Sequence, residues 1–146
     1  MPVQVTVASF TLPDQRFHNL ATEADSLGYK FVNKFQHRWK HNLSRYDRDG
    51  EKLLEISNGN TIVAFGSLCI DPYADDPSIG RVRHIYVMSA FRKLGYGRLL
   101  LETLLEGPHP FSRIRLRAGD ETASAFYDSI GWVRSNDEDA THEAPL

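Results

Sequence analysis

The sequence predicts a mixed α/β fold, in which a sheet that is antiparallel in its first half is covered by helices. Two apolar runs flank Asn58-Gly59, and this arrangement is the strongest short signal for a β-hairpin. Helical spacing of apolar residues precedes the hairpin, and strand and helix patterns alternate after it. The predicted order is therefore β-α-α-β-β-β-α-β-α-β.

The N-terminal half supplies the first strand, two helices and the hairpin. A strand is predicted over 3–10, where valine recurs at alternate positions. A helix is expected over 11–28, beginning with a Thr-x-x-Asp capping box and ending at a glycine. A second helix is predicted over 30–42, because an aromatic residue recurs there every four positions. In the hairpin, 52–57 should pair with 61–70.

The C-terminal half alternates strands and helices. Strands are predicted over 80–88 and 113–118, and helices over 96–107 and 121–131. A short strand follows from 131, and the polar remainder is either a further strand or a tail. Arginine alternates with apolar residues in the second of these strands, which predicts an exposed face for Arg113, Arg115 and Arg117.

Length and composition are those of one globular domain, expected to span residues 1–146. The formal net charge of −2 argues against a nucleic-acid-binding protein that relies on bulk positive charge. The single cysteine, Cys69, excludes an intramolecular disulfide and a cysteine zinc cluster. Because we find neither a long apolar run nor a secretory signal pattern, we expect a cytoplasmic protein without a membrane anchor.

The stretch Phe91–Leu100, FRKLGYGRLL, places two glycines before an apolar helix. Unpaired N–H groups at a helix start can hold an anion, and the neighbouring basic residues have the right charge. A P-loop is excluded because Gly97 is followed by Arg-Leu, and a dinucleotide fingerprint is excluded because Leu100 replaces its third glycine. On these residues alone, a phosphate cradle and a plain flexible turn are equally supported.

Two blocks of the chain resemble the GCN5-related N-acetyltransferases (GNAT). Arg92, Gly95 and Gly97 fill the R/Q-x-x-G-x-G/A signature that this family uses for acetyl-CoA, and RHIYV before them resembles its fourth strand. The second block, DETASAFYDSIGW, resembles N-x-x-A-x-x-F-Y-x-x-x-G-F. It departs from that pattern at Asp120 and Trp132, where Asn and Phe are usual. The resemblance extends from about residue 81 to residue 132.

The resemblance implies the GNAT acyl-CoA N-acyltransferase fold, with a mostly antiparallel sheet that splays between strands four and five. Acetyl-CoA would lie in this V as a co-substrate. Its pantetheine would pair with the backbone of strand four, and its pyrophosphate would lie on the N–H groups of residues 94–98. The implied cofactor-binding residues are Ile85, Tyr86, Val87, Arg92, Lys93, Leu94, Gly95, Tyr96, Gly97, Arg98, Asp120 and Phe126.

The same resemblance implies that Tyr127 protonates the leaving thiolate. A base would help because an alkylammonium has a pKa of about 10.4. His84 is the candidate for this base, although an ordinary strand histidine is at least as well supported. Asp71, Glu55 and His37 are weaker candidates, and ordered water is an alternative. The histidine spacing does not support a metal site.

The expected function is direct transfer of an acetyl group from acetyl-CoA to a primary amine of a small molecule or a protein, in a ternary complex. The alternative is a non-catalytic acetyl-CoA-binding module. The acceptor stays open, because a basic segment over 30–45 and the acidic loop of Asp71, Asp75 and Asp76 point in opposite directions. Both read more simply as solvated surface. The family resemblance also allows a homodimer.

Overall fold

The predicted hairpin lies within the sheet, and its two turn residues are Gly59 and Asn60, one position after Asn58-Gly59. The structure, a computed structural model, describes residues 4–6, 15–41, 43 and 46–145. Its strands form one seven-stranded mixed sheet in the order β1-β2-β3-β4-β5-β7-β6. The strands are β1 (Gln4–Thr6), β2 (Lys52–Asn58), β3 (Thr61–Ile70), β4 (Ile79–Val87), β5 (Arg113–Leu116), β6 (Val133–Arg134) and β7 (His142–Glu143).

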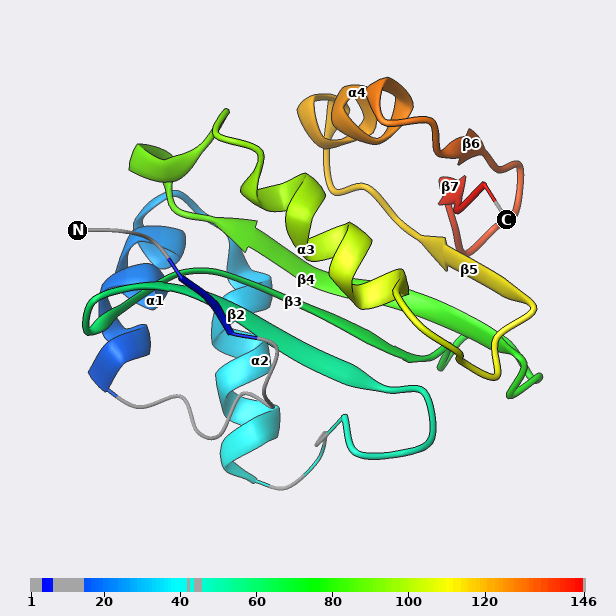
Figure 1. The fold of residues 1–146 in the computed structure, drawn as a ribbon, viewed down its shortest axis with the longest axis horizontal. Helices are drawn as coiled ribbons and strands as arrows, with labels where there is room; N and C mark the ends of the chain where they lie inside the picture. Colours follow the sequence, from blue (N-terminus) through cyan, green and yellow to red (C-terminus); the bar gives the residue numbers. More distant parts are fainter. Residues whose placement is uncertain (1–3, 7–14, 42, 44–45, 146) are drawn as a thin grey trace.

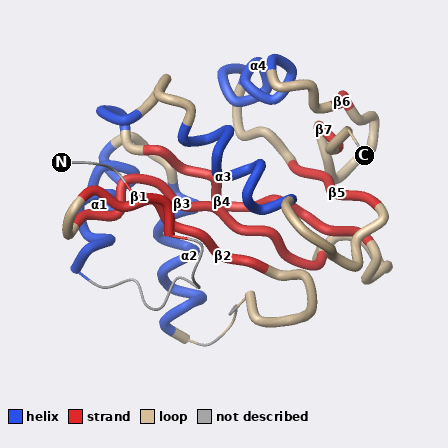
Figure 2. Tube along the Cα trace, viewed as in Figure 1, coloured by secondary structure: helices blue, strands red, loops and turns tan. Residues whose placement is uncertain are grey.

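Helices cover both faces of the sheet (Figure 1), as the mixed α/β prediction requires. They are α1 (His18–Ser26), α2 (Lys30–Lys40), α3 (Tyr96–Leu105) and α4 (Glu121–Ser129), with short 3₁₀ turns at Gln15–Phe17 and Ser89–Phe91. Helix α3 packs on one face, and α1 and α2 pack on the other, so that the strands form a layer between them (Figure 2). The predicted capping box at 11–14 lies outside the described residues.

Each face of the sheet has its own apolar core. On the α3 side, Leu100, Leu101 and Leu104 are buried against β2, β3 and β4. On the other side, Phe17 and Phe35 pack on Phe65 of β3. The interior of β3 is buried on both faces, which explains its nearly continuous apolar sequence.

Strand β4 contains a β-bulge. Phe65 pairs with Tyr86 and Ser67 pairs with Arg83, so Gly66 alone faces two residues of β4, His84 and Ile85. His84 takes the left-handed φ of 63°, which is uncommon outside glycine. A Cβ on Gly66 would stand 2.3 Å from Cδ1 of Ile85, so the glycine makes room for the extra residue.

The bulge lies within the part of β4 that has no described strand on its second side. The only parallel pair of the described sheet, β4 with β5, extends from Ile79–Arg113 to Arg81–Arg115 and stops there. Six further residues of β4 continue beyond it without β5. Met88 donates to the Val63 carbonyl, and the antiparallel alternation therefore turns the N–H and C=O of Val87 away from β3, toward the opening. The predicted splay between strands four and five is thus present.

The polar C-terminal segment, for which a strand and a tail were alternatives, includes β7. This short strand lies between β5 and β6 and pairs antiparallel with both. A local sequence pattern could not indicate it, because it is two residues long and its partners in β5 lie 26 or more positions away. No helix among the described residues has the length and apolar character needed to cross a membrane.

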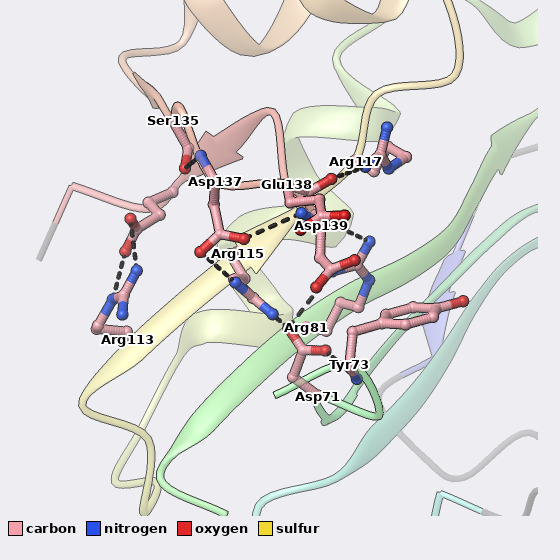
Figure 3. A network of polar contacts seen from close by, with 11 residues as sticks. Asp71, Tyr73, Arg81, Arg113, Arg115, Arg117, Ser135, Asp137, Glu138 and Asp139 are labelled. Atoms are coloured by element: carbon pink, nitrogen blue, oxygen red, sulfur yellow. Dashed lines mark hydrogen bonds and ion pairs between the residues drawn. The ribbon is translucent and has the colours of Figure 1, made fainter. Parts of the chain in front are cut away.

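Two predictions about charged residues are wrong. Arg115 of β5 is only 3% exposed, and Asp71 of the acidic loop is only 1% exposed. Arg115 and Arg81 both pair with Asp71 Oδ2, and Arg115 also reaches Asp137 at 2.9 Å (Figure 3). The prediction treated each element as having a free face, but loop 135–139 and the loop after β3 cover that face of β5. Arg113 and Arg117 are exposed as predicted.

Candidate functional site

A cleft of about 980 Å³ opens where β4 and β5 separate. The free part of β4 and the end of β5 form its two sides, and the turn before α3, the start of α4 and the α1–α2 connection close its ends. Tyr127, His84 and all but one of the residues that the sequence nominated for cofactor binding line this cleft. The exception is Leu94, which is 60% exposed.

The glycine turn forms one end of the cleft. Gly95 precedes α3 with a left-handed φ of 87°, and no side chain caps the helix start. The first N–H groups of α3 therefore have no side-chain acceptor, as an anion site requires. The side chains of Arg92, Lys93 and Arg98 line the same end and add positive charge.

The two glycines serve different purposes. Gly95 is needed for its backbone conformation, since a Cβ there would meet no atom within 4 Å. A Cβ on Gly97 would stand 3.3 Å from Cζ of Phe126, so this glycine lets α4 approach α3. Gly95 therefore sets the backbone of the turn, and Gly97 sets the distance between the two helices.

Arg92 attaches the glycine turn to the end of β4. Its Nε donates to the Val87 carbonyl at 2.8 Å, and its guanidinium lies 5.5 Å from the centre of the Tyr86 ring. The Tyr86 hydroxyl in turn donates to Glu23 Oε1 at 2.6 Å, and Ser89 N–H donates to the same oxygen. Burial and the bond to Glu23 raise the pKa of Tyr86. The turn, β4 and α1 are thus connected by directed polar contacts.

Asp120 begins α4 at the opposite wall of the cleft. Its Oδ1 accepts a hydrogen bond from the Ala123 N–H at 2.8 Å, which is the usual N-cap arrangement. Asn and Asp both make this bond, so the replacement of the family's usual Asn keeps the helix start intact.

Tyr127 projects from α4 and is 7% exposed. Its ring packs on Phe126, Trp132 and His142. Its hydroxyl makes no hydrogen bond to any residue that the structure describes, and the side chain lines the cleft. Burial raises the pKa of Tyr127 to about 12, so the hydroxyl keeps its proton at neutral pH.

His84 sits at the bulge, with its ring between aromatic side chains. It stacks on Phe31 at 6.1 Å and lies 5.4 Å from the Phe35 ring, measured between ring centres. Burial, together with the positive charges of Arg83 and Arg38, lowers the pKa of His84 to about 3. The ring is therefore neutral at physiological pH and is a weak proton acceptor.

Replacement of His84 by Asn should change how stability depends on pH. The pKa of His84 is lower in the folded protein than in the unfolded chain, where it is about 6.5. Below about pH 6.5 the histidine is therefore protonated in the unfolded chain but not in the folded protein, so the wild-type protein loses stability as the pH falls. We expect this residue to contribute a loss of about 2 kcal/mol between pH 7.5 and pH 5. Asn accepts the left-handed φ and does not titrate, so His84→Asn should flatten the profile.

Urea denaturation at several pH values measures this effect. His37→Asn is the matched control, since His37 is exposed on α2 and outside the cleft, and this variant should keep the wild-type slope. Equal slopes for the wild type and His84→Asn would contradict the expectation.

The weaker base candidates lie away from the cleft. Glu55 is 5% exposed and pairs with Arg16 at 3.0 Å, and Asp71 belongs to the buried ion cluster. His37 packs against His41 on the exposed side of α2. Within the described ranges, no group of three His, Cys, Asp or Glu side chains has the arrangement of a metal site.

Sequence reasoning singled out no individual residue at the α1–α2 end of the cleft, although the basic segment over 30–45 includes part of it. Tyr29, Lys30 and Phe31 lie at the α1–α2 connection, and Arg83 lies on β4 beside the bulge. Their helical or strand periodicity is ordinary, so no local pattern distinguishes them. Only the packing of α2 against β4 brings them to the cleft.

Comparison with known proteins agrees with this geometry. The sequence model of the acetyltransferase (GNAT) domain matches residues 49–134, which is more than half of the chain. No curated protein matches the chain significantly.

Several solved structures share the fold. A protein of Exiguobacterium sp. 255-15 that is assigned as an acetyltransferase superposes with a TM-score of 0.79 at 23% identity, over 99% of this chain and 93% of the other. An acetyltransferase of Thermus thermophilus superposes with a TM-score of 0.72 at 14% identity, over 100% and 98% of the two chains.

A third structure contains a ligand. The PaiA N-acetyltransferase of Thermoplasma acidophilum, solved in complex with coenzyme A, has a TM-score of 0.67 at 13% identity, over 98% and 97% of the chains. Likeness at these identities shows a shared fold. The match over residues 49–134, which include β4, the glycine turn, β5 and α4, shows more: the chain belongs to the GNAT family of acetyltransferases.

Proposed function

We propose that this protein transfers an acetyl group from acetyl-CoA directly to a primary amine, with both substrates bound at once. The observation that carries the proposal is the single cleft in which the free edge of β4, the glycine turn and the Tyr127 hydroxyl meet. A relative of the same fold binds coenzyme A, which supports the choice of donor.

The donor would lie along β4 with its phosphates at the glycine turn. The uncapped N–H groups of α3 and the charges of Arg92, Lys93 and Arg98 suit a pyrophosphate. The polar groups of Val87 that face the opening suit an amide of the pantetheine, which would extend the sheet as an added strand does. Because Arg92 Nε already donates to the Val87 carbonyl, a pantetheine N–H would either bond to the same oxygen beside Arg92 or replace it.

In the transfer, the neutral amine attacks the thioester carbon, and the carbon–sulfur bond of the resulting tetrahedral adduct breaks. The N–H of Val87 faces the opening, where it would stabilise the oxyanion of that adduct. The Tyr127 hydroxyl would donate to the departing sulfur, which leaves as the thiol. Its raised pKa keeps it protonated, and the same burial would also raise the pKa of the thiol.

The proton of the amine requires a separate route. A pKa of about 3 makes His84 a poor base for an ammonium group. Its ring, which stacks on Phe31, would instead form part of the aromatic lining of the cleft. Water in the open cleft, or binding of the amine already in its neutral form, would supply the deprotonated nucleophile.

Release of free thiol from acetyl-CoA, measured against a panel of amines, tests this proposal. Thiol release that requires both the protein and an amine is the expected result, and mass spectrometry should find the acetylated amine. Binding of CoA without any turnover would favour the alternative of a non-catalytic CoA-binding module. Complete failure to bind CoA would overturn both.

Gly95→Ala should weaken CoA binding through the backbone of the turn. An alanine at the φ of 87° costs roughly 1–2 kcal/mol, and relief of this strain would move the N–H groups of the cradle. Gly107→Ala is a matched control, because Gly107 has a φ of 79°, has equally free space, and lies outside the cleft. Calorimetry should show a weaker CoA affinity for Gly95→Ala only, whereas both variants should lose similar stability. Equal CoA affinities would contradict a role for this turn.

A further inference from the structure

We propose that the acceptor is an amine that also carries a carboxylate, bound by Arg83 and Lys30 beside the aromatic side chains of Tyr29 and Phe31. This inference rests on the proposed transferase function and specifies its second substrate. The evidence for the acceptor comes from the cleft residues that acetyl-CoA would not contact.

The acceptor would occupy the part of the cleft that remains when the residues proposed to bind the donor are set aside. The donor would use the glycine turn, the Val87 edge and the surroundings of Tyr127. The remaining lining residues include the α1–α2 connection, with Tyr29, Lys30 and Phe31, and Arg83 and His84 of β4. Phe31 joins these two groups, because its ring stacks on His84.

The charge of the cleft is strongly one-sided. Asp120 is the only carboxylate among the described residues that line it, and this side chain caps α4. Lysine or arginine lines the cleft at Lys30, Arg81, Arg83, Arg92, Lys93, Arg98 and Arg117. Arg92, Lys93 and Arg98 lie at the glycine turn, where the donor phosphates would bind. Lys30, Arg81, Arg83 and Arg117 are then the cations to consider for a second anion.

Of the cleft arginines outside the donor end, Arg83 is the one whose side chain bonds to no described residue. Arg81 is neutralised by Asp71, and Arg117 donates to the Glu138 carbonyl. Arg83 forms neither an ion pair nor a side-chain hydrogen bond with any described residue, although it is partly buried. A partly buried guanidinium favours a bidentate partner such as a carboxylate.

Aromatic rings line the same cleft as Arg83. Tyr29 and Phe31 meet edge to face at 6.1 Å, and Phe31 also meets Tyr86 at 6.1 Å. His84 stacks on Phe31 as a neutral ring, because its pKa is lowered. The site therefore offers flat apolar walls next to a positive charge, which suits an amine with an apolar or aromatic body and one anionic group.

A polycationic acceptor fits these observations poorly. A polyamine or a lysine-rich peptide would bring further positive charge to an end of the cleft that contains Arg83 and Lys30 and no described carboxylate. Only the reacting amine, in its neutral form, is compatible with such surroundings.

Matched pairs of amines test the inference. L-phenylalanine and 2-phenylethylamine differ only by the carboxylate, and spermidine represents the polycations. With acetyl-CoA fixed, we expect kcat/KM for phenylalanine to exceed that for phenylethylamine by about 10- to 100-fold, the usual effect of a hydrogen bond to a charged group. Arg83→Gln should remove most of this preference by lowering kcat/KM for phenylalanine, and Arg83→Lys should restore part of it.

Lys30→Gln should also reduce this preference, because Lys30 lines the same end of the cleft, and Lys34→Gln is its matched control. Lys34 lies one turn further along α2, is exposed and does not line the cleft, so it should not change the selectivity. A preference for phenylethylamine or spermidine, or an unchanged selectivity in Arg83→Gln, would overturn the inference. The second of these results would also place Arg83 in the smaller pocket of about 350 Å³ that it borders.

Binding of the products separates this inference from the proposed function. Thermal melts of the CoA-saturated protein with N-acetylphenylalanine and with N-acetyl-2-phenylethylamine report selectivity without turnover. Selective stabilisation by the carboxylate, in the absence of any turnover, would contradict the transferase function and support only a carboxylate-binding site at this end of the cleft. Equal effects of the two compounds would overturn the inference, whether or not the protein is active.

Discussion

Asp71→Ala is expected to destabilise the protein by about 3–5 kcal/mol, because it leaves two buried guanidinium groups without their shared anion. Both Arg81 and Arg115 are at most 5% exposed, so water cannot replace the lost carboxylate. Asp71 Oδ1 also accepts the Tyr73 N–H at 2.8 Å, and this bond would be lost as well. Such a loss is a large part of the roughly 5–15 kcal/mol that is typical of a domain.

Asp75→Ala is the matched control. Asp75 lies in the same loop, is exposed and makes no ion pair with any residue that the structure describes. Its replacement should change the free energy of unfolding by less than about 0.5 kcal/mol. Urea denaturation measures both variants, and Asp71→Asn, which keeps the size of the side chain, serves if the alanine variant does not fold. Equal stability of the Asp71 and Asp75 variants would show that the cluster contributes nothing.

The pH dependence gives a second check on the same cluster. Burial alone would raise the pKa of Asp71, but the hydrogen bonds from Arg115 and Tyr73 and the charge of Arg81 outweigh it and lower that pKa. A lowered folded-state pKa stabilises the protein above the unfolded value of about 3.9 and ceases to do so as the pH falls below it. The stability difference between the wild type and Asp71→Ala should therefore be constant near neutrality and narrow below about pH 4.

The cluster also joins the base of the cleft to the C-terminal loop. Arg81 and Arg115 occupy the last paired register of β4 and β5, and they reach Asp139 O and Asp137 respectively. The cluster thus holds the two strands together at the point beyond which they separate (Figure 3). We expect CoA binding to weaken in any Asp71 variant that still folds.

Tyr127→Phe should lower kcat by about 10²- to 10⁴-fold, the usual contribution of a general acid, and leave the KM for acetyl-CoA nearly unchanged. Only the hydroxyl is removed, and it bonds to no described residue, so the packing on Phe126, Trp132 and His142 persists. The stability of the variant should therefore equal that of the wild type within about 0.5 kcal/mol.

Tyr46→Phe is the control for a generic effect of removing a buried hydroxyl. Burial raises the pKa of Tyr46 to about 12, as it does for Tyr127, but Tyr46 does not line the cleft. Its kcat should stay within about threefold of the wild type. Unchanged turnover in Tyr127→Phe, with the acetylated amine still formed, would show that the thiolate leaves without this residue.

Where a feature depends on neighbours along the chain, the sequence predicted it well. Asn58-Gly59 marks the tight turn to within one residue, and apolar spacing near 3.6 residues marks α2 and α3, so these elements lie where the patterns place them. The glycine turn and the Phe-Tyr block are similarly local. Each consists of a short run of consecutive residues that matches a sequence motif of the family.

Features that depend on distant contacts were missed or misjudged. Arg115 has the alternating pattern of an exposed strand face, yet it is buried because Asp71, 44 positions earlier, and Asp137 converge on it. His84 has the pattern of an ordinary strand residue, yet the bulge opposite Gly66 turns its ring into an aromatic cluster that lowers its pKa. Burial and desolvation are properties of the assembled structure, so no local pattern contains them.

The sequence by itself therefore determined the fold class, the family, the glycine turn before α3 and the position of Tyr127 on α4. These rest on local periodicity and on short motifs that need no knowledge of distant contacts. Only the tertiary structure decided what surrounds His84, what neutralises Arg81 and Arg115, and which arginine of the cleft has no side-chain partner among the described residues. The reason is physical: charge, burial and free hydrogen-bonding capacity at a site are set by side chains that the folding of the sheet brings together from opposite ends of the chain.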